Sequence, residues 1–168
     1  HDIVLSPGSR NAPLLVSVAK EKKLRHFVIP DERSAAFFAL GIAQQSQRTV
    51  ALICTSGTAL LNYAPAIAEA YYQGIPLLVI SADRPPEWID QDDSQTIRQN
   101  NILTPFVKYS CQLPVNIVTP EDRWYANRLI NEAINASQTA YKGPVHVNIP
   151  LREPLYGFHS HGISPQRI

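Results

Sequence analysis

The sequence is poor in cysteine, and its two cysteines lie far apart. Cys54 and Cys111 form no CxxC pair and belong to no His/Cys cluster, which argues against a zinc site and against a dithiol redox motif. We predict that both are buried structural thiols, which fits a protein of the reducing cytoplasm.

Charge of one sign and long apolar runs are also scarce. The net charge of +1 creates no basic field that would gather nucleic acid or an anionic membrane surface. No apolar stretch approaches the roughly 20 residues of a membrane-spanning helix, and no basic-then-apolar leader opens the sequence. With 45% hydrophobic residues among 168, the composition is that of one ordinary globular domain. We therefore expect no nucleic-acid partner and no membrane span.

Several common site motifs are missing as well. No GxGxxG follows a strand-like run, and there is neither a GK[ST] Walker loop nor a GxSxG nucleophile elbow, which argues against ordinary dinucleotide binding. Asp90, Asp92 and Asp93 lack the spacing and the distal glutamate of a calcium loop, so a solvated acidic loop is the better interpretation. His146 is interpreted as a satisfied residue of a sheet. The sequence therefore assigns no metal ligand.

Apolar runs of strand length alternate with helical stretches. This pattern predicts an α/β fold, a doubly wound open sheet of about six parallel strands with helices on both faces. Strands are expected near 2–5, 26–30, 49–54, 76–81, 106–112 and 145–149, and helices near 12–22, 33–46, 58–73 and 121–138.

Two of the expected helices carry unusual residues. The helix near 33–46 is apolar nearly all round, so we expect it to be deeply buried. Gly41 within it predicts close packing against another backbone, because glycine otherwise weakens a helix interior. Pro65 should kink the helix near 58–73 or mark its effective start.

Polar clusters follow the first four strand-like runs. Because the carboxyl ends of parallel strands meet at one edge of the sheet, these clusters should converge there and form a small-molecule site. The polar stretch 82–101 is too long for an idle connection, and loops of that length are usually functional or mobile. The four clusters span residues 6–11, 31–34, 55–58 and 82–87.

Glu32 is the candidate catalytic residue. It precedes a helix rich in alanine and phenylalanine, so its carboxyl group should be poorly hydrated and suited to exchange a proton or to hold a strong hydrogen bond to a heterocyclic nitrogen. The alternative is helix capping, in which Asp31 caps the N-terminus and Glu32 only benefits from the helix dipole. The residues alone leave both interpretations open.

Arginines in two of the clusters are candidate anion-binding residues. Ser9 and Arg10 follow a Pro-Gly turn and precede a helix, where backbone N–H groups, a hydroxyl and a guanidinium together suit a carboxylate or phosphate. Arg84, with Gln95 and Arg98 beyond it, offers a second set of donors, and an arginine holds a carboxylate with two parallel hydrogen bonds. Solvated surface arginines are the alternative in both places.

Taken together, these motifs resemble the N-terminal pyrimidine-binding (Pyr) domain of thiamine-diphosphate enzymes, and in particular the MenD family of menaquinone biosynthesis. The Ser-Pro-Gly-Ser-Arg and Ala-Asp-Arg-Pro-Pro-Glu blocks are specific to that family, whereas the glutamate before an alanine-rich helix is shared more widely. The resemblance covers nearly the whole chain. Its motifs lie at 6–13, 31–33, 39–43, 55–59, 82–87, 95–99, 143–148 and 153–157.

The resemblance implies roles for individual residues. Glu32 would be catalytic and hydrogen-bond N1′ of the aminopyrimidine of thiamine diphosphate. The family's activity is that of a transferase, which decarboxylates 2-oxoglutarate and adds the remaining succinyl semialdehyde unit to isochorismate. The implied cofactor-binding residues are Glu32, Thr55, Ser56, Gly57 and Thr58, and the implied isochorismate-binding residues are Ser9, Arg10, Arg84 and Gln95.

One departure from the family pattern concerns the diphosphate. The family anchors it through Mg²⁺ with a Gly-Asp-Gly…Asn motif on a separate domain, and no such motif occurs here. The chain therefore resembles an excised domain, with 1–157 as the Pyr domain and 158–168 as a tail or the start of a linker to a central domain. Such a fragment should be inactive alone and belong to a homo-oligomer, a dimer or tetramer. The alternatives are a domain of an acetolactate-synthase-like enzyme and a non-catalytic carboxylate-binding module.

Overall fold

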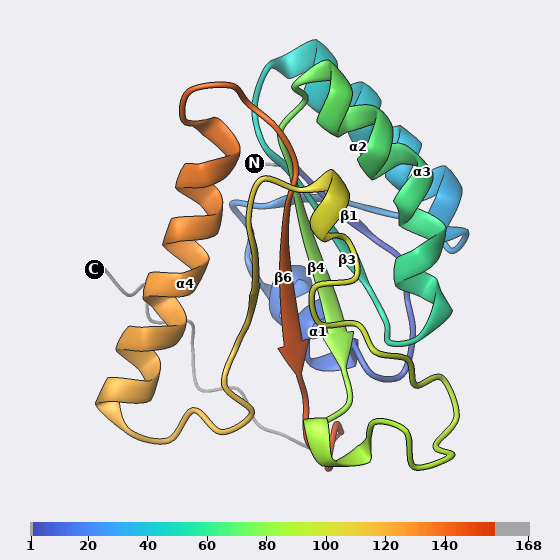
Figure 1. The fold of residues 1–168 in the computed structure, drawn as a ribbon, viewed down its shortest axis with the longest axis vertical. Helices are drawn as coiled ribbons and strands as arrows, with labels where there is room; N and C mark the ends of the chain where they lie inside the picture. The colour runs from blue at the N-terminus through green and yellow to red at the C-terminus, as the bar shows by residue number, and fades with distance from the viewer. Residues whose placement is uncertain (1, 157–168) are drawn as a thin grey trace.

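A computed structural model describes residues 2–156 of the chain, so the predicted tail at 158–168 lies outside the described residues. Six strands form one all-parallel sheet in the order β2-β1-β3-β4-β6-β5, which confirms the predicted fold class (Figure 1). The strands are β1 Asp2–Leu5, β2 Arg25–Val28, β3 Val50–Cys54, β4 Leu77–Asp83, β5 Ser110–Gln112 and β6 Val145–Pro150. The helices are α1 Ala12–Lys20, α2 Glu32–Ser46, α3 Thr58–Gln73 and α4 Pro120–Gln138, with 3-10 turns η1 Pro86–Trp88 and η2 Thr104–Phe106.

Helices cover both faces of the sheet. Alternate residues of the central strands point to opposite faces, so Leu52 and Val79 pack against α2 and α3, while Ile53 and Leu78 face α1 and α4. Figure 1 shows α2 and α3 together on one side, α4 on the other, and α1 behind the strands. None of the helices in the described residues combines the length and apolar character that a membrane crossing requires.

Local signals place the helix starts close to the predicted positions. The Asp31 carboxylate accepts a hydrogen bond from the Ser34 amide at 2.7 Å, which caps α2 as the capping alternative required. Thr119 and Asp122 form a reciprocal capping box at the start of α4. Pro65 lies inside α3, which begins seven residues earlier at Thr58, so this proline does not mark the helix start.

The fifth strand is shorter than predicted. Residues 104–106 form a 3-10 turn, and only Ser110–Gln112 pair with β6. Leu103 and Val107 are buried in the core beside α3 instead of extending the edge strand. Pro105 has no N–H to donate to a ladder, which favours the turn. The prediction that both cysteines are buried is confirmed for Cys54 and wrong for Cys111, which is only partly buried.

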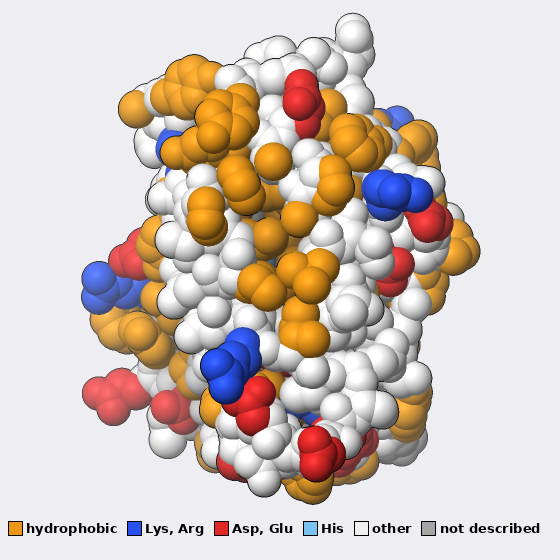
Figure 2. All heavy atoms as spheres, turned by 45° about the vertical axis from the view of Figure 1, so that its right-hand side comes forward, with side chains coloured by type: hydrophobic (Ala, Val, Ile, Leu, Met, Phe, Trp, Pro, Cys, Tyr) orange, Lys and Arg blue, Asp and Glu red, His pale blue; other side chains and the backbone are white. Residues whose placement is uncertain are grey.

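The prediction of a deeply buried α2 is wrong for one face of the helix. Ala35, Ala36 and Ala39 are fully buried, but Phe37 and Phe38 expose 46% and 43% of their surface. A Cβ built on Gly41 would meet no atom within 4 Å, so the expected close backbone packing is also wrong within this chain. Figure 2, which brings the α2 and α3 side forward, shows hydrophobic side chains spread over this face.

His146 is buried in β6 and is only half satisfied. Its Nε2 lies 2.8 Å from Ser81 Oγ, while its Nδ1 is buried without a partner, which corrects the prediction of a satisfied histidine. Ser81 donates its single hydroxyl proton to Asn148 Oδ1 at 2.8 Å, so Nε2 must carry the proton toward Ser81. Burial lowers the pKa of His146 to about 4.

This histidine should make the stability of the domain depend on pH. Above the usual histidine pKa of 6.5 the imidazole is neutral in the folded and in the unfolded chain, so its titration does not change the free energy of unfolding. As the pH falls from 6.5 toward 4, the unfolded chain binds a proton that the folded chain does not bind. The free energy of unfolding should therefore drop by about 1.4 kcal/mol per pH unit in this window.

Urea unfolding of the 168-residue protein between pH 4 and 8 measures the effect. His146→Gln is the matched control, because its amide can still donate to Ser81 but does not titrate. The wild type should lose about 3 kcal/mol more than this variant. Parallel stability profiles for the two proteins would contradict the prediction.

Candidate functional site

The loops that follow β1 and β3 touch each other at the carboxyl edge of the sheet. A Cβ added to Gly8 would lie 2.4 Å from Thr55 Cβ, so only glycine permits this contact. The Asn11 side chain braces the first loop by donating to Ser6 O and accepting from the Gly8 amide, each at 2.9 Å. Tyr63, buried in α3, donates to Ser6 Oγ at 3.1 Å. The loop after β1 is thus held in place by these hydrogen bonds and by its contact with the loop after β3.

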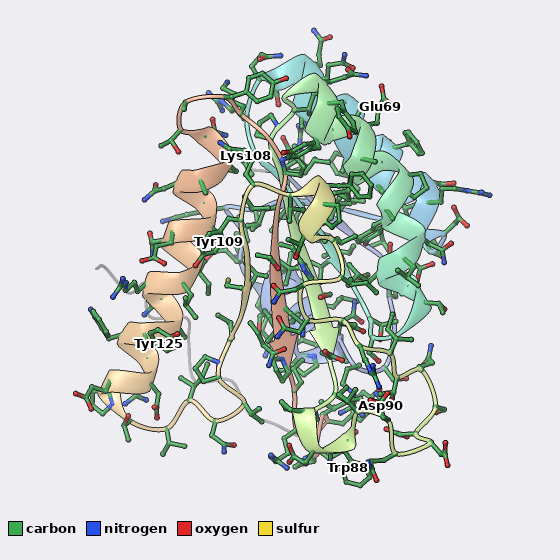
Figure 3. All side chains as sticks on the ribbon, in the orientation of Figure 1. Glu69, Trp88, Asp90, Lys108, Tyr109 and Tyr125 are labelled. Carbon is green, nitrogen blue, oxygen red and sulfur yellow. The ribbon has the colours of Figure 1, made fainter. Side chains whose placement is uncertain are left out.

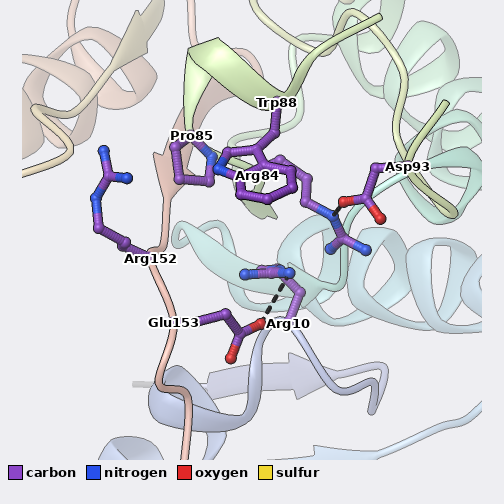
Figure 4. Close-up of a pocket in the computed structure, with 7 residues that line it drawn as sticks. All are labelled: Arg10, Arg84, Pro85, Trp88, Asp93, Arg152 and Glu153. Atoms are coloured by element: carbon purple, nitrogen blue, oxygen red, sulfur yellow. Dashed lines mark hydrogen bonds and ion pairs between the residues drawn. The ribbon is translucent and has the colours of Figure 1, made fainter. Parts of the chain in front are cut away.

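A cavity of about 400 Å³ lies beside these two loops. We call it the cationic pocket, and it is lined by Arg10, Arg84, Pro85, Trp88, Asp93, Arg152 and Glu153. Figure 4 shows Arg10 and Arg84 on opposite sides of it, with Glu153 beside Arg10 and Asp93 beside Arg84. Figure 3 places Trp88 at the end of the molecule where the strands terminate, with Lys108 and Glu69 at the other end.

Arg10 is buried, and its partners lie about 140 residues later in the sequence. Its Nη1 donates to Leu151 O at 3.0 Å, and its Nη2 pairs with Glu153 at 3.1 Å. Its Nε is buried and has no partner. Burial, and next the nearby positive charge of Arg84, lower the pKa of Arg10. An anion entering the pocket would relieve this repulsion.

Arg84 reaches across to the loop after β3. Its Nη1 donates to Ser56 Oγ at 3.3 Å and its Nη2 to Ser94 O at 2.7 Å, while its Nε pairs with Asp93. Its side chain is only 11% exposed. A side chain fixed by three bonds presents its charge in one direction, which suits recognition of a carboxylate at low entropic cost.

Glu32 stands at the first turn of α2, directly after its Asp31 cap. Its carboxylate is partly buried and has no hydrogen-bond or ion-pair partner in the described chain. It lies close enough to act electrostatically on Cys54 and Tyr63, and its negative charge adds to the burial that raises the pKa of both groups. Capping is thus the work of Asp31, and the Glu32 carboxylate is left available for a ligand.

Residues 55–58 form the turn between β3 and α3, which we call the 55–58 turn. Thr55, Ser56 and Gly57 are buried, and Thr58 is exposed at the start of α3. The Thr55 hydroxyl is buried without a partner, an arrangement that a bound polar ligand would complete. Gly57 adopts φ +84°, and a Cβ there would lie 2.9 Å from Gln95 O. This turn therefore requires glycine for its backbone angle and for the close approach of residue 95.

Gly57 and Gly41 form a matched pair for substitution by alanine. Gly57→Ala should lower the free energy of unfolding by about 1–3 kcal/mol, because the side chain is strained and collides with Gln95. Gly41→Ala should raise it by about 0.5–1 kcal/mol, because alanine stabilises an open helix position. Chemical denaturation of the two 168-residue variants measures both. A gain in stability for Gly57→Ala would contradict the close packing described here.

Some residues singled out from the sequence lie outside the cationic pocket. Ser9 and Gln95 are exposed, and neither lines it, although the backbone of Gln95 packs on Gly57. Arg98 is 82% exposed and pairs with Asp90. Conversely, Trp88, Arg152 and Glu153 line the pocket but were missed. The last two directly follow a strand-like run, and Glu153 opens the 153–157 motif, but neither was assigned a role.

A set of buried amides under the 84–103 segment was also missed. Gln99 is 1% exposed, and its side chain bonds to Gly57, Ala82 and Asn148. Asn148 in turn bonds to Asp83 and Gln112. Burial raises the pKa of Asp83. No group of three or more His, Cys, Asp or Glu side chains in residues 2–156 is placed to hold a metal ion.

Comparison with known proteins links this arrangement to a cofactor. The family model described as "Thiamine pyrophosphate enzyme, N-terminal TPP binding domain" matches residues 1–102. The 2-succinyl-5-enolpyruvyl-6-hydroxy-3-cyclohexene-1-carboxylate synthase of Cytophaga hutchinsonii is 58% identical over 92% of this chain. The synthase of the same name from Porphyromonas gingivalis is 56% identical over 94%. The chain spans only 28% and 27% of the lengths of these relatives.

A solved structure has the same fold. The benzoylformate decarboxylase of Polynucleobacter necessarius superposes with a TM-score of 0.76 over 99% of this chain and 30% of its own. Its sequence identity is 21%, so this likeness concerns the fold alone.

Proposed function

Because the chain belongs to the thiamine pyrophosphate enzymes, as their N-terminal TPP-binding domain, we propose that it is the Pyr domain of a MenD-type synthase. The full protein would decarboxylate 2-oxoglutarate and add the succinyl semialdehyde unit to isochorismate. The observation that carries this proposal is the pair Arg10 and Arg84 sharing one cavity at the sheet edge where the Glu32 carboxylate stands unpaired. The names of the relatives support the same reaction.

The cofactor is thiamine diphosphate, and the side chains present fit its aminopyrimidine end. That ring carries nitrogen atoms that can accept and donate hydrogen bonds, and the domain offers the unpaired Glu32 carboxylate and the unpartnered Thr55 hydroxyl. When bound, the cofactor supplies a carbon nucleophile for 2-oxoglutarate. Glu32 holds a proton at the ring nitrogen, and the 55–58 turn positions the ring through Thr55, Ser56, Gly57 and Thr58.

Isochorismate carries two carboxylates, and the cationic pocket holds three guanidinium groups, those of Arg10, Arg84 and Arg152. Arg84 and Arg10 bind these carboxylates, and the exposed Ser9 and Gln95 close on the substrate from the rim. Glu153 and Asp93 hold the two arginines in place before the substrate arrives. A pyruvate site, as in an acetolactate-synthase relative, needs fewer cationic groups. This difference favours isochorismate over that alternative.

Mg²⁺ and the diphosphate are held outside this chain. Residues 2–156 offer no cluster of acidic or histidine ligands, and the sequence has no Gly-Asp-Gly…Asn motif. Residues 1–157 form the Pyr domain, and residues 158–168 form a tail or the beginning of a linker. The protein is cytoplasmic, which its two unpaired cysteines support.

The full-length protein is a homo-oligomer, a dimer or tetramer. The exposed face of α2 supports this proposal, because Phe37, Phe38 and Gly41 line a shallow hollow of about 520 Å³ that no part of residues 2–156 fills. A contiguous apolar patch of this kind marks an interaction site. Helix α2 carries this hollow along its later turns and Glu32 at its first turn, so a partner that covers the whole length of the helix could complete the cofactor site.

The test is a carboligation assay with purified full-length protein, thiamine diphosphate, Mg²⁺, 2-oxoglutarate and isochorismate. The full-length protein should release CO₂ and form the coupled product, and the 168-residue domain alone should do neither. Turnover of pyruvate in place of 2-oxoglutarate would favour the acetolactate-synthase-like alternative. Carboxylate binding without any turnover by the full-length protein would favour a binding module. Robust carboligation by the domain alone would refute the proposed division of the site.

A further inference from the structure

We propose that Gln99 is a positioning residue that holds the 55–58 turn and the cationic pocket in a single arrangement. This inference deepens the proposed function and rests on it. Gln99 contacts neither the cofactor nor the substrate in this scheme. It acts through the backbone of Gly57 and through Asn148.

The Gln99 side chain joins three segments that are distant in the sequence. Its Oε1 accepts a hydrogen bond from the Gly57 amide at 2.6 Å. Its Nε2 donates to Ala82 O at 3.1 Å and to Asn148 Oδ1 at 3.0 Å. The side chain is fully enclosed, so no water can replace these bonds without opening the structure.

These bonds belong to a closed ring. Asn148 Nδ2 donates to Asp83 Oδ2 at 2.8 Å, and the Arg84 amide donates to Asp83 Oδ1 at 2.8 Å. The Arg84 guanidinium then reaches Ser56 Oγ, the neighbour of Gly57, at 3.3 Å. The ring therefore passes once through the 55–58 turn and once through the cationic pocket.

The direction of every bond in the ring is determined. The Gly57 N–H only donates and Ala82 O only accepts, so Gln99 must turn its oxygen toward the turn and its NH₂ group toward Asn148 Oδ1. Asn148 must then turn its own NH₂ group toward Asp83. The backbone of the turn thus sets the orientation of the amides that reach the carboxyl group beside Arg84, and a residue without an amide at position 99 breaks this order.

The test uses the full-length protein with Gln99→Met, which keeps the length of the side chain and removes its amide. Gln112→Met is the matched control, because Gln112 also bonds to Asn148, at 3.0 Å, but within residues 2–156 makes no hydrogen bond to the 55–58 turn or to Arg84. The dissociation constant of thiamine diphosphate with Mg²⁺, the KM for isochorismate and the melting temperature are measured for each protein.

Gln99→Met should raise both the cofactor dissociation constant and the isochorismate KM by at least about fivefold, whereas Gln112→Met should leave both within about twofold. If Gln99→Met does not fold, Gln99→Asn carries the test, since its shorter amide cannot span from Gly57 to Asn148. A folded Gln99 variant that moves only one constant, or neither, overturns the inference. Equal shifts in Gln112→Met overturn it as well.

The wild-type protein separates this inference from the proposed function. A wild type that neither binds thiamine diphosphate nor decarboxylates 2-oxoglutarate refutes the proposed function and removes the basis for the role of Gln99. A fully active wild type together with an unaffected Gln99→Met variant refutes the positioning role alone.

Discussion

Glu32→Gln in the full-length protein is expected to lower kcat by at least about 100-fold while leaving the fold intact, because a glutamine cannot take part in proton exchange. The change is conservative in shape, and Asp31 rather than Glu32 caps α2. The carboxylate has no partner within the described chain, so its loss leaves no orphaned group there. The substitution should therefore lower the catalytic rate without lowering the stability of the fold.

The measurement combines turnover with exchange of the C2 proton of bound thiamine diphosphate in deuterated water. Both rates should fall together, and the melting temperature should stay within a few degrees of the wild type. Asp31→Asn is the matched control at the neighbouring position, because asparagine also caps a helix well. It should keep nearly full activity. Activity of Glu32→Gln close to that of the wild type would remove Glu32 from the catalytic role.

Arg84→Met should raise the KM for isochorismate on the order of 100-fold, because it removes a largely desolvated guanidinium from the substrate's carboxylate. Arg84 is 11% exposed and fixed by contacts to Ser56, Asp93 and Ser94. Arg84→Lys should recover only part of the affinity, because an ammonium group cannot make two parallel hydrogen bonds to one carboxylate.

Arg98→Met is the control for this variant. Arg98 belongs to the same loop and pairs with Asp90, but it is 82% exposed and lies outside the cationic pocket. Exposed ion pairs contribute little to stability. The KM of the Arg98→Met variant for isochorismate should therefore stay within about twofold of the wild-type value. If Arg84→Met raises the KM for 2-oxoglutarate and leaves that for isochorismate unchanged, the assignment of this pocket to isochorismate is wrong.

The order of helices and parallel strands could be predicted well from the sequence. Residues within a few positions of one another encode this information, such as the apolar run of β3 and the Asp31 cap of α2. Where the prediction was wrong, a tertiary contact decided the outcome. The segment before β5 turned inward because Leu103 and Val107 found space in the core.

The candidate site residues show the same division. Glu32, Arg10 and Arg84 were recognisable because each follows a strand-like run, and all such ends meet at one edge of a parallel sheet. Glu153 and Gln99 lie in the motifs 153–157 and 95–99 but were assigned no role, because their partners Arg10 and Gly57 lie far away along the chain. The exposed face of α2 was misjudged because hydrophobicity alone does not distinguish a core contact from an exposed apolar face.

Local patterns along the 168 residues are therefore sufficient to predict the parallel sheet, its helices and the edge at which the candidate site residues gather. These properties depend on side-chain periodicity and on the chirality of short connections, both of which act over short stretches of chain. The partners of each arginine, and the amides that join the turn to the pocket, depend on distances between segments brought together only by packing. No pattern within one segment contains those distances, so the folded chain alone decides them.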